Sequence, residues 1–202
     1  MPSGRSTGES LTPGPGRPRR QETDRSIREA ALSLLRQRGP AAVTVEAVAA
    51  ESGVAKTTIY RRYADREAVL RAALGAAIGT PGEPTGTTPR ERIQWALGQA
   101  WYQMAEVLGR GGLSAILQGA DPRFTDLFRS VLSPYSDALV ELMRSDMAAG
   151  KLRPDLQPET VVSLFIGAYL GELVRRGRVD TGFSESVLDL LWMAMTADCP
   201  RE

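Results

Sequence analysis

The sequence predicts an all-α fold. Along nearly every segment between turn signals, apolar residues recur at spacings of three and four, which is the period of an amphipathic helix. No run alternates apolar and polar residues in the way that a half-buried strand does. The chain has 202 residues and is 42% hydrophobic, so it can bury a core in one large domain or two small ones. We expect about nine helices from this periodicity.

The N-terminal part predicts four helices, each bounded by a side chain that can cap its free amides or by a glycine that ends it. Thr23 or Asp24 is the expected start of the first helix, and Gly39 is its expected end. The inward face of this helix carries Ile27, Ala30, Ala31, Leu34 and Leu35. The other three are expected at 44–51 with Thr44 as the cap, at 55–63, and from the cap Asp65 onward.

Helix breakers separate this part from a second helical region. Residues 79–89 read Gly-Thr-Pro-Gly-Glu-Pro-Thr-Gly-Thr-Thr-Pro, which predicts a long loop or a domain boundary. Thr88 and Glu91 then form a capping box at the start of a helix, which the glycine-rich stretch 109–112 is expected to end. Pro134 is expected to kink or break the long helical segment that contains it. The remaining helices are expected at 113–118, 121–149, 158–176 and 184–195.

Composition argues against several classes of protein. The single Cys199 excludes an internal disulfide, and a chain without histidine cannot form a cysteine and histidine zinc site. The sequence gives little support for an enzyme, because it shows no nucleophile paired with a base, no phosphate-binding loop and no metal-ligand spacing. We expect no cofactor. Residues 1–16 lack the apolar core of an export signal, and the apolar run 161–170 is too short to span a bilayer. We expect a cytoplasmic protein with no membrane partner.

Charge is unevenly distributed along the chain. Residues 1–72 carry 13 Lys or Arg and 8 Asp or Glu, whereas the rest of the chain carries 12 and 16. A basic N-terminal module on an acidic body is the distribution expected of a protein that binds phosphates at one end. An imbalance of this size is common, so it gives only minor support.

The stretch 44–63 has the pattern of a helix-turn-helix. Apolar residues pack its two short helices together, and Gly53 between them permits the left-handed turn conformation. The side chains left facing outward offer hydroxyls and cations, which bond to phosphate oxygens and to base edges in a major groove. They are Lys56, Thr57, Thr58, Tyr60, Arg61 and Tyr63. Taken alone, the pattern also fits a small helical bundle whose polar surface faces water.

A family resemblance favours the DNA-binding interpretation. Residues 49–63, Ala-Ala-Glu-Ser-Gly-Val-Ala-Lys-Thr-Thr-Ile-Tyr-Arg-Arg-Tyr, followed by Asp-Arg-Glu-Ala-Val-Leu at 65–70, resemble the DNA-binding signature of the TetR family of transcriptional regulators. The resemblance covers roughly residues 20–75. It implies a helix-turn-helix DNA-binding domain of three helices over 21–78 and a helical effector-binding and dimerisation domain over 88–199.

The resemblance also implies roles for single residues. The DNA-reading helix would begin near Lys56, and the residues expected to reach bases or phosphates are Thr57, Thr58, Tyr60 and Arg61. Thr44 and Arg66 would contact the DNA backbone. The chain departs from the usual pattern at Ala55, Arg62 and Arg66, where relatives often carry a serine, an aromatic residue or histidine, and a lysine. These departures leave the operator preference open.

Residues 1–20 are expected to form a disordered basic arm, because they contain few apolar residues and are rich in glycine and proline. Arg17, Arg19 and Arg20 lie where relatives carry a basic extension. Arginines on a mobile arm can enter a narrow minor groove. The sequence fits equally well a solvated tail that makes no contact with DNA.

By position, the helices expected at 158–176 and 184–195 correspond to the pair that forms the dimer interface in relatives. Expected interface residues are Val161, Leu164, Ala168, Gly171, Leu188, Leu191 and Trp192. Two copies of the chain would place two reading helices about 34 to 36 Å apart, or a multiple of that distance, to match a palindromic operator.

In relatives, the region between the DNA-binding domain and the dimer helices encloses a ligand. In this chain, the large apolar residues of that region either line such a pocket or belong to the hydrophobic core. They are Trp95, Trp101, Tyr102, Met104, Leu117, Phe124, Phe128, Tyr135, Met143, Phe165 and Tyr169. Few charged residues accompany them, which points to a bulky, mostly apolar small molecule. The resemblance implies a homodimeric repressor that leaves its DNA operator when this molecule shifts the fourth helix. A ligand-binding or scaffolding dimer without sequence-specific regulation is the alternative.

Overall fold

The computed structural model describes residues 16–180 and 182–196, and every regular element within those ranges is helical. The all-α prediction is confirmed. The α-helices are α1 Gly16–Arg38, α2 Val45–Ser52, α3 Lys56–Tyr60, α4 Arg66–Ile78, α5 Pro89–Tyr102, α6 Gly109–Gln118, α7 Pro122–Ala148, α8 Pro158–Arg176 and α9 Phe183–Met195. A short 3-10 helix at Pro40–Ala42 follows α1, and a π-helical segment at Gln103–Leu108 joins α5 to α6.

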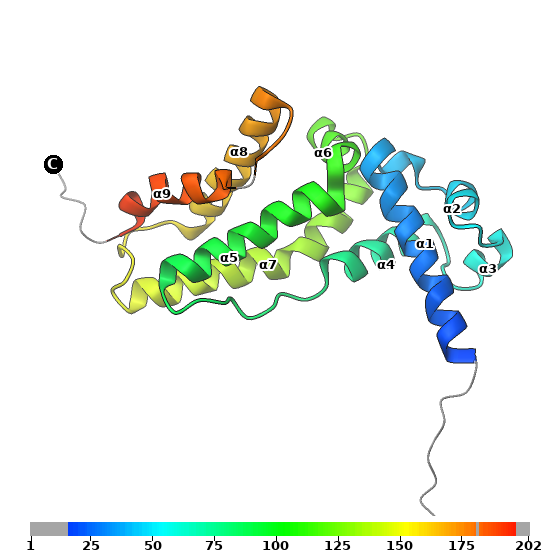
Figure 1. Ribbon diagram of the computed structural model, residues 1–202, viewed down its shortest axis with the longest axis horizontal. Helices are drawn as coiled ribbons and strands as arrows, with labels where there is room; N and C mark the ends of the chain where they lie inside the picture. The colour runs from blue at the N-terminus through cyan, green and yellow to red at the C-terminus, as the bar shows by residue number, and fades with distance from the viewer. Residues whose placement is uncertain (1–15, 181, 197–202) are drawn as a thin grey trace, which may run out of the picture.

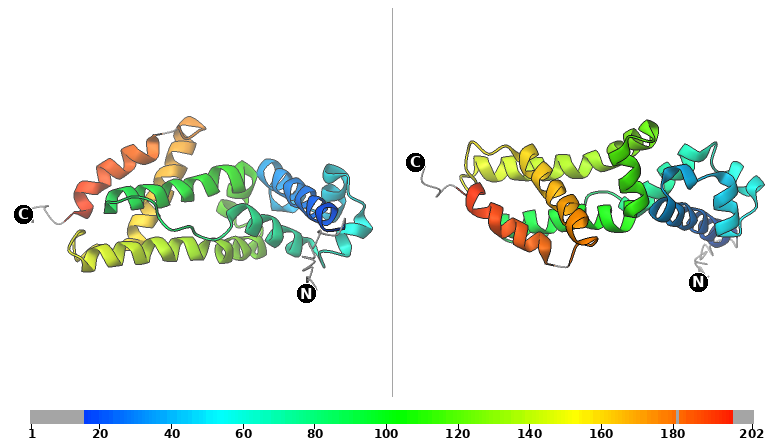
Figure 2. Two further views of the ribbon diagram at one scale, coloured as in Figure 1. Left: turned by 60° about the horizontal axis from the view of Figure 1, so that its bottom comes forward. Right: turned by 90° about the horizontal axis from the view of Figure 1, so that it is seen from above.

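The helices form an elongated molecule. Figure 1 shows α1, α2 and α3 at one end, α8 and α9 at the other, and α5 and α7 running side by side between the two ends. The two further views in Figure 2 show the same separation. The helix α1 packs against α2 and α4 and also against α6 and the π-helical segment, so it connects its own end to the middle of the molecule.

The first helix begins earlier than predicted. α1 starts at Gly16, so Thr23 and Asp24 lie inside it and neither caps it. Pro18 is compatible with this start, because it falls in the first turn, where a backbone amide has no helical partner to lose. Asp24 forms an ion pair with Arg62, whose Nη1 lies 3.0 Å from Asp24 Oδ1.

The prediction of a disordered arm over residues 1–20 is therefore wrong for its last five residues, 16–20, whose backbone is helical. Residues 1–15 lie outside the described part of the chain. Of the three candidate arginines, Arg17 and Arg19 lie in the first turns of α1, and the side chain of Arg20 is exposed there.

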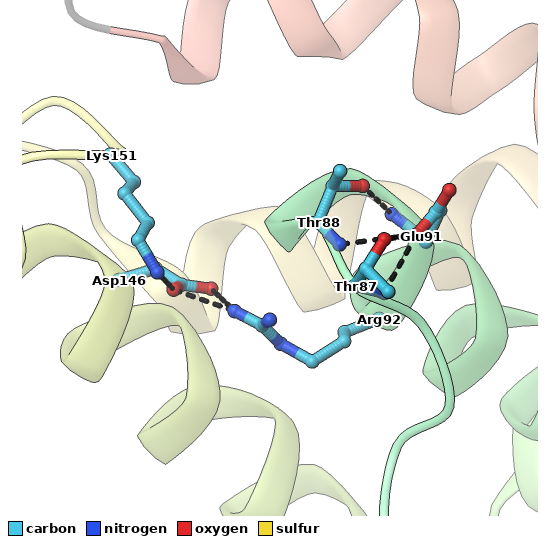
Figure 3. A network of polar contacts seen from close by, with 6 residues as sticks. All are labelled: Thr87, Thr88, Glu91, Arg92, Asp146 and Lys151. Carbon is cyan, nitrogen blue, oxygen red and sulfur yellow. Dashed lines mark hydrogen bonds and ion pairs between the residues drawn. The ribbon is translucent and has the colours of Figure 1, made fainter.

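The three helix starts with capping residues agree with the prediction. Thr44 Oγ1 accepts from the amide of Ala47 at 3.1 Å, and Asp65 Oδ1 accepts from the amide of Ala68 at 2.8 Å. Thr88 forms a complete capping box, because its hydroxyl accepts from the Glu91 amide and Glu91 Oε2 accepts from the Thr88 amide. Figure 3 shows this reciprocal pair at the start of α5.

The glycines at 109–112 begin a helix, whereas the sequence predicted that they end one. α5 passes into the π-helical segment, and α6 then starts at Gly109. The reason is a close approach between helices: a Cβ added at Gly111 would lie 2.4 Å from the amide nitrogen of Gly39 and 2.6 Å from the carbonyl oxygen of Leu35. Only glycine lets the start of α6 lie this close to the end of α1.

Pro134 does not break α7, which continues from Pro122 to Ala148. A proline removes the amide that would bond to the carbonyl four residues earlier, which here belongs to Ser130. The hydroxyl of Ser133 donates to that carbonyl at 3.5 Å. A side chain therefore takes over part of the lost backbone interaction.

A buried ion pair fastens α5 to α7. Asp146 on α7 is 3% exposed, and its Oδ1 and Oδ2 accept from Arg92 Nη2 on α5 at 2.7 and 2.9 Å. Lys151 Nζ lies 3.6 Å from Asp146 Oδ1 and completes the cluster shown in Figure 3. The paired guanidinium compensates for the burial of the carboxylate, so this contact fixes how the two long helices lie against each other.

Candidate DNA-binding surface and ligand cavity

The α2-turn-α3 unit is held together by a small apolar contact and a turn. Val48 and Ile59 are both fully buried between its helices. Gly53 ends α2 with a φ of 69°, a left-handed conformation that favours glycine. Ser52 Oγ donates to the Val48 carbonyl at 2.6 Å and accepts from the Val54 amide at 3.2 Å, which fixes the turn. These contacts set the direction in which α3 presents its polar side chains.

Most of the predicted outward set lies on the surface. The exposed members are Lys56, Thr57, Tyr60 and Arg61, and Thr58 is half-buried beside them. Tyr60 is 53% exposed, although it is a large aromatic residue. Thr44 lies at the start of α2, where its hydroxyl oxygen caps the helix and its hydroxyl hydrogen can still be donated. This surface therefore offers hydroxyls, a phenol and cations together.

Tyr63 is less available than the sequence suggested. Its ring packs against the apolar core, and its position is half-buried. Burial raises the pKa of the Tyr63 hydroxyl above its ordinary value, and the nearby Asp24 carboxylate adds to the effect. Tyr63 supports the surface from beneath rather than forming part of its exposed face.

Lys56 is partly neutralised by an acidic neighbour. Its Nζ lies 3.4 Å from Glu46 Oε1, and both side chains are more than half exposed. The pKa of Glu46 lies below its ordinary value because a backbone hydrogen bond at its own residue and a hydrogen bond from Lys56 favour the carboxylate. A fixed negative charge therefore stands beside the first residue of α3.

Arg66 is engaged within the protein, so the predicted contact with the DNA backbone is not available in this conformation. Its Nη2 donates to the Pro40 carbonyl at 2.6 Å and to Asp121 Oδ2 at 2.7 Å. Burial disfavours the Asp121 carboxylate, but hydrogen bonds from Arg66 and from the Phe124 amide outweigh burial and lower its pKa. The pair joins the first residue of α4 to the cap of α7, and the sequence had not indicated this long-range contact.

A cavity of about 220 Å³ lies among α5, the π-helical segment, α6, α7 and α8, with the loop before α5 along one side. Seven residues predicted for a pocket line it: Trp95, Trp101, Met104, Leu117, Phe128, Tyr135 and Phe165. None of the described residues around it is charged. Among its large apolar residues, Leu117 and Ile166 are the exposed ones, at 66% and 40%.

Four other predicted pocket residues lie elsewhere. Phe124 and Met143 are 2% and 0% exposed and belong to the core, because they sit on the face of α7 that packs inward. Tyr102 and Tyr169 border a separate, more polar hollow near Arg110. Helical spacing could not separate these residues from the cavity set, since each of them is large and apolar.

The cavity also contains a polar residue that the sequence analysis missed. Gln103, the first residue of the π-helical segment, is only 3% exposed and lines the cavity. Its Oε1 is buried and has no hydrogen-bond partner among the described residues. Nothing in the sequence singles out this glutamine, because its isolation arises from the apolar side chains that fold around it.

The ring nitrogen of Trp101 and the hydroxyl of Tyr135, both in the cavity wall, are already engaged within the protein. Trp101 Nε1 donates to the Phe165 carbonyl at 3.3 Å. The Tyr135 hydroxyl donates a short hydrogen bond to the carbonyl of Ile78, the last residue of α4. A residue of the cavity wall is therefore bonded directly to the far end of α4.

The predicted dimer surface divides into an inward and an outward set. Val161 and Leu188 are 6% and 0% exposed because they pack into the core of their own chain, so they cannot lie on an outward interface. Ala168, Leu191 and Trp192 are half-buried, whereas Leu164 and Gly171 are exposed. The large apolar residues that the prediction omitted are more exposed still: Val174 at 86%, Leu190 at 80% and Met193 at 76%.

The described residues contain neither a membrane-spanning helix nor a cluster of metal-ligating side chains. None of their helices combines the length and apolar character that crossing a membrane requires. Among residues 16–180 and 182–196, no three metal-ligating side chains lie close enough together to hold a metal ion.

Comparison with known proteins connects these features to a family. The sequence model of the bacterial regulatory proteins of the tetR family matches residues 27–73, which span the second half of α1, all of α2 and α3 and the first part of α4. A curated relative is the uncharacterized HTH-type transcriptional regulator YdeS of Bacillus subtilis (strain 168), 27% identical over 172 residues, which are 80% of this chain and 83% of that protein.

Two solved structures share the fold over nearly their whole length. One is the transcriptional regulator FadR of Bacillus subtilis in complex with stearoyl-CoA, with a TM-score of 0.66, 19% identity and coverage of 83% of this chain and 96% of that chain. The other is a TetR-family transcriptional regulator from a Rhodococcus species, with a TM-score of 0.64, 20% identity and coverage of 87% and 100%. Residues 27–73 therefore match the DNA-binding domain of the tetR family of bacterial regulatory proteins, and the whole chain is similar in sequence or fold to transcriptional regulators.

Proposed function

We propose that this protein is a homodimeric repressor that leaves a palindromic DNA operator when a small, mostly apolar molecule occupies the cavity. The observation that carries the proposal is that α4, which packs against α1 in the end that holds α3, is bonded to a residue of the cavity wall. A polar, exposed α3 lies at one end, an uncharged cavity lies in the body, and α4 is bonded to α7 at both of its ends. The expectation of a cytoplasmic protein belongs to the same proposal.

In this proposal, α3 enters the major groove. Thr57, Tyr60 and Arg61 are its exposed donors for base edges and phosphates, and Lys56 adds a cation at the start of the helix. Thr44 donates its hydroxyl hydrogen to a phosphate beside the groove. We omit Arg66 from this contact set, because Pro40 and Asp121 hold its guanidinium.

The exposed apolar residues of α8 and α9 support dimerisation. Leu164, Gly167, Gly171 and Val174 recur at spacings of three and four, so they share one face of α8, and each of them is exposed. Large apolar side chains that are exposed together on neighbouring helices, as on α8 and α9, are typical of a protein–protein interface. A two-fold dimer repeats the DNA-binding end and would match an operator with two half-sites.

The coupling between cavity and DNA would act through α4. Asp121 holds Arg66 at the start of this helix, and Tyr135 holds the Ile78 carbonyl at its end. A molecule that displaces the Tyr135 side chain would loosen or shift the end of α4, and α4 packs against α1 in the DNA-binding end. Allosteric coupling of this kind typically changes affinity by about 5- to 150-fold.

The decisive test is binding to DNA. The purified protein is titrated into the DNA fragment upstream of its own gene and into a shuffled fragment of the same length. The Thr57→Ala and Tyr60→Ala variants, which each remove one proposed DNA contact of α3, are titrated in the same way. We expect sequence-specific binding by the wild type, and binding by the variants weakened about tenfold or more per lost base contact. Binding that ignores sequence would contradict the proposal and support a scaffolding or ligand-binding dimer.

A further inference from the structure

We propose that Asp24 and Arg62 are positioning residues for DNA recognition, because their ion pair fixes the angle at which α3 presents its side chains to the major groove. This proposal rests on the proposed contact of α3 with DNA. Neither residue belongs to that contact set. The sequence pattern predicted Asp24 only as a possible helix cap, and Arg62 only as a departure from the residue usual in relatives.

The helix α3 has little of its own to hold it in place. It consists of five residues, Lys56–Tyr60, and helices this short are not stable by themselves. It packs mainly against α2, and Ile59 is the one of its residues that is buried. An anchor at one side chain leaves a short helix free to tilt about that point. A second fixed point is needed to define its direction.

The ion pair supplies this second point at the end of α3. Arg62 directly follows Arg61, and its amide donates to the Ile59 carbonyl at 2.9 Å, so its backbone is continuous with the last turn of the helix. Its Nη1 donates to Asp24 Oδ1 at 3.0 Å. Asp24 lies on α1, three residues before the fully buried Ile27, and α1 packs against α2 and α4. The pair therefore ties the end of α3 to a helix that is itself held in the core.

Burial gives the pair its strength and limits its direct access to DNA. The side chains of Arg62 and Asp24 are 15% and 27% exposed. Surface ion pairs contribute little to stability, whereas a largely buried charge that loses its partner is strongly unfavourable. The Asp24 carboxylate compensates the charge of a guanidinium whose Nε has no hydrogen-bond partner among the described residues. Arg62 therefore acts through α3, in contrast to the exposed Arg61 beside it.

The opposite charges of the two residues separate positioning from direct electrostatic attraction. If they acted on phosphates by charge alone, Arg62→Gln would weaken DNA binding and Asp24→Asn would strengthen it. If they position α3, either change breaks the same contact, and both variants bind the operator more weakly. Net charge acts alike on every DNA sequence, whereas a misplaced α3 loses base contacts. Positioning therefore changes the ratio of operator affinity to non-specific affinity.

The test measures this ratio for the full chain with two duplexes. One is a sequence that the wild-type protein selects from a random pool, and the other is a shuffled duplex of the same composition. We expect Arg62→Gln and Asp24→Asn each to lower the ratio about tenfold, the cost of one lost base contact. The double variant should lower it by about the same factor, because all three variants lose one shared contact.

A conservative variant and a second ion pair provide the controls. Arg62→Lys keeps a cation opposite Asp24 and should restore the ratio to within about threefold of the wild type. Glu67 and Arg71 form an exposed pair on α4, where Arg71 Nη2 lies 2.8 Å from Glu67 Oε1. Glu67→Gln and Arg71→Gln should each leave the ratio within about twofold of the wild type.

Hydrogen exchange of the free protein, followed by mass spectrometry, examines α3 without DNA. In both single variants, the amides of residues 58–63 should exchange at least about threefold faster relative to those of α2. If a single variant does not fold, the double variant replaces it, since it leaves no buried charge without a partner. Charge alone would leave the ratio of the double variant unchanged, because the two lost charges cancel.

The inference is overturned by an unchanged ratio, by opposite effects of the two single variants on operator binding, or by unchanged exchange in α3. A wild-type protein that selects no sequence from the pool would instead contradict the proposed function. In that case the exchange of residues 58–63 still decides whether the ion pair holds α3 in place.

Discussion

At the scale of single residues, the DNA-binding surface carries one group that opposes its proposed role. Glu46 lies beside Lys56, and hydrogen bonds that favour its carboxylate lower its pKa, so it is ionised throughout the neutral range. A carboxylate at this position repels phosphate and reduces the effective charge of the lysine. We interpret it as a restraint on binding that ignores sequence.

Glu46→Gln should therefore strengthen binding to non-specific DNA by roughly threefold at low salt. Because Lys56 is then free to displace a counter-ion, the slope of log affinity against log salt should steepen by up to about 1. Glu67→Gln is the matched control, since Glu67 is also the second residue of its helix and pairs with an arginine, Arg71. Equal gains in the two variants would show that net charge alone is responsible.

Tyr135 is the second residue whose role can be tested, through its hydroxyl group. Tyr135→Phe removes its hydrogen bond to the Ile78 carbonyl and keeps the ring in the cavity wall. A hydrogen bond of this kind contributes about 1 kcal/mol, so amides at the end of α4 should exchange with solvent about five- to tenfold faster. Hydrogen exchange with mass spectrometry measures this, and Tyr102→Phe, which changes an exposed tyrosine, is the control. Unchanged exchange in α4 would remove Tyr135 from the coupling path.

At the scale of elements, the packing of α5 on α7 depends on a buried charge. Asp146→Asn should lower the free energy of unfolding by about 3 kcal/mol, because it leaves the Arg92 guanidinium without its partner. Chemical denaturation measures the loss. Asp137→Asn, an exposed change on the same helix, should alter stability by less than about 0.5 kcal/mol. Similar losses in both variants would contradict a specific role for the Asp146 pair.

The first turns of α1 are the second element that can be tested. Replacing Arg17, Arg19 and Arg20 together by glutamine should flatten the salt dependence of DNA binding by about 0.9 for each phosphate contact that is lost. Substitution is preferable to deletion here, because deleting residues 1–20 would also remove the start of α1. A slope and an affinity equal to those of the wild type would show that these arginines are only solvated.

At the scale of the whole molecule, the apolar faces of α8 and α9 determine the assembly that we propose. Leu190 is 80% exposed on α9, so an aspartate there costs the folded monomer little but places a charge in an apolar interface. Leu190→Asp should convert the dimer to a monomer, as measured by light scattering, and weaken operator binding at least tenfold. Leu117→Asp changes a similarly exposed leucine on α6 and should leave the dimer intact. A dimeric Leu190→Asp variant would place the interface elsewhere.

Local chemistry in the sequence was enough to predict several of the features that depend on neighbours within a few residues. The caps Thr44, Asp65 and Thr88 each bond to an amide three residues later, and Gly53 adopts the left-handed turn within its own segment. The order of the helices and the polar face of α3 follow from the same short-range periodicity. The sequence by itself therefore determined the all-α fold and the helix-turn-helix.

Only the tertiary structure decided which side chains meet across long separations. Arg66 bonds to Asp121, 55 residues away, and Tyr135 bonds to Ile78, 57 residues away, and no periodicity encodes such pairs. The same holds for Phe124, which is core although its neighbour Phe128 on the next turn lines the cavity. Burial and pairing are properties of the packed chain, so the isolation of Gln103 Oε1 arises only once apolar residues from several helices surround it.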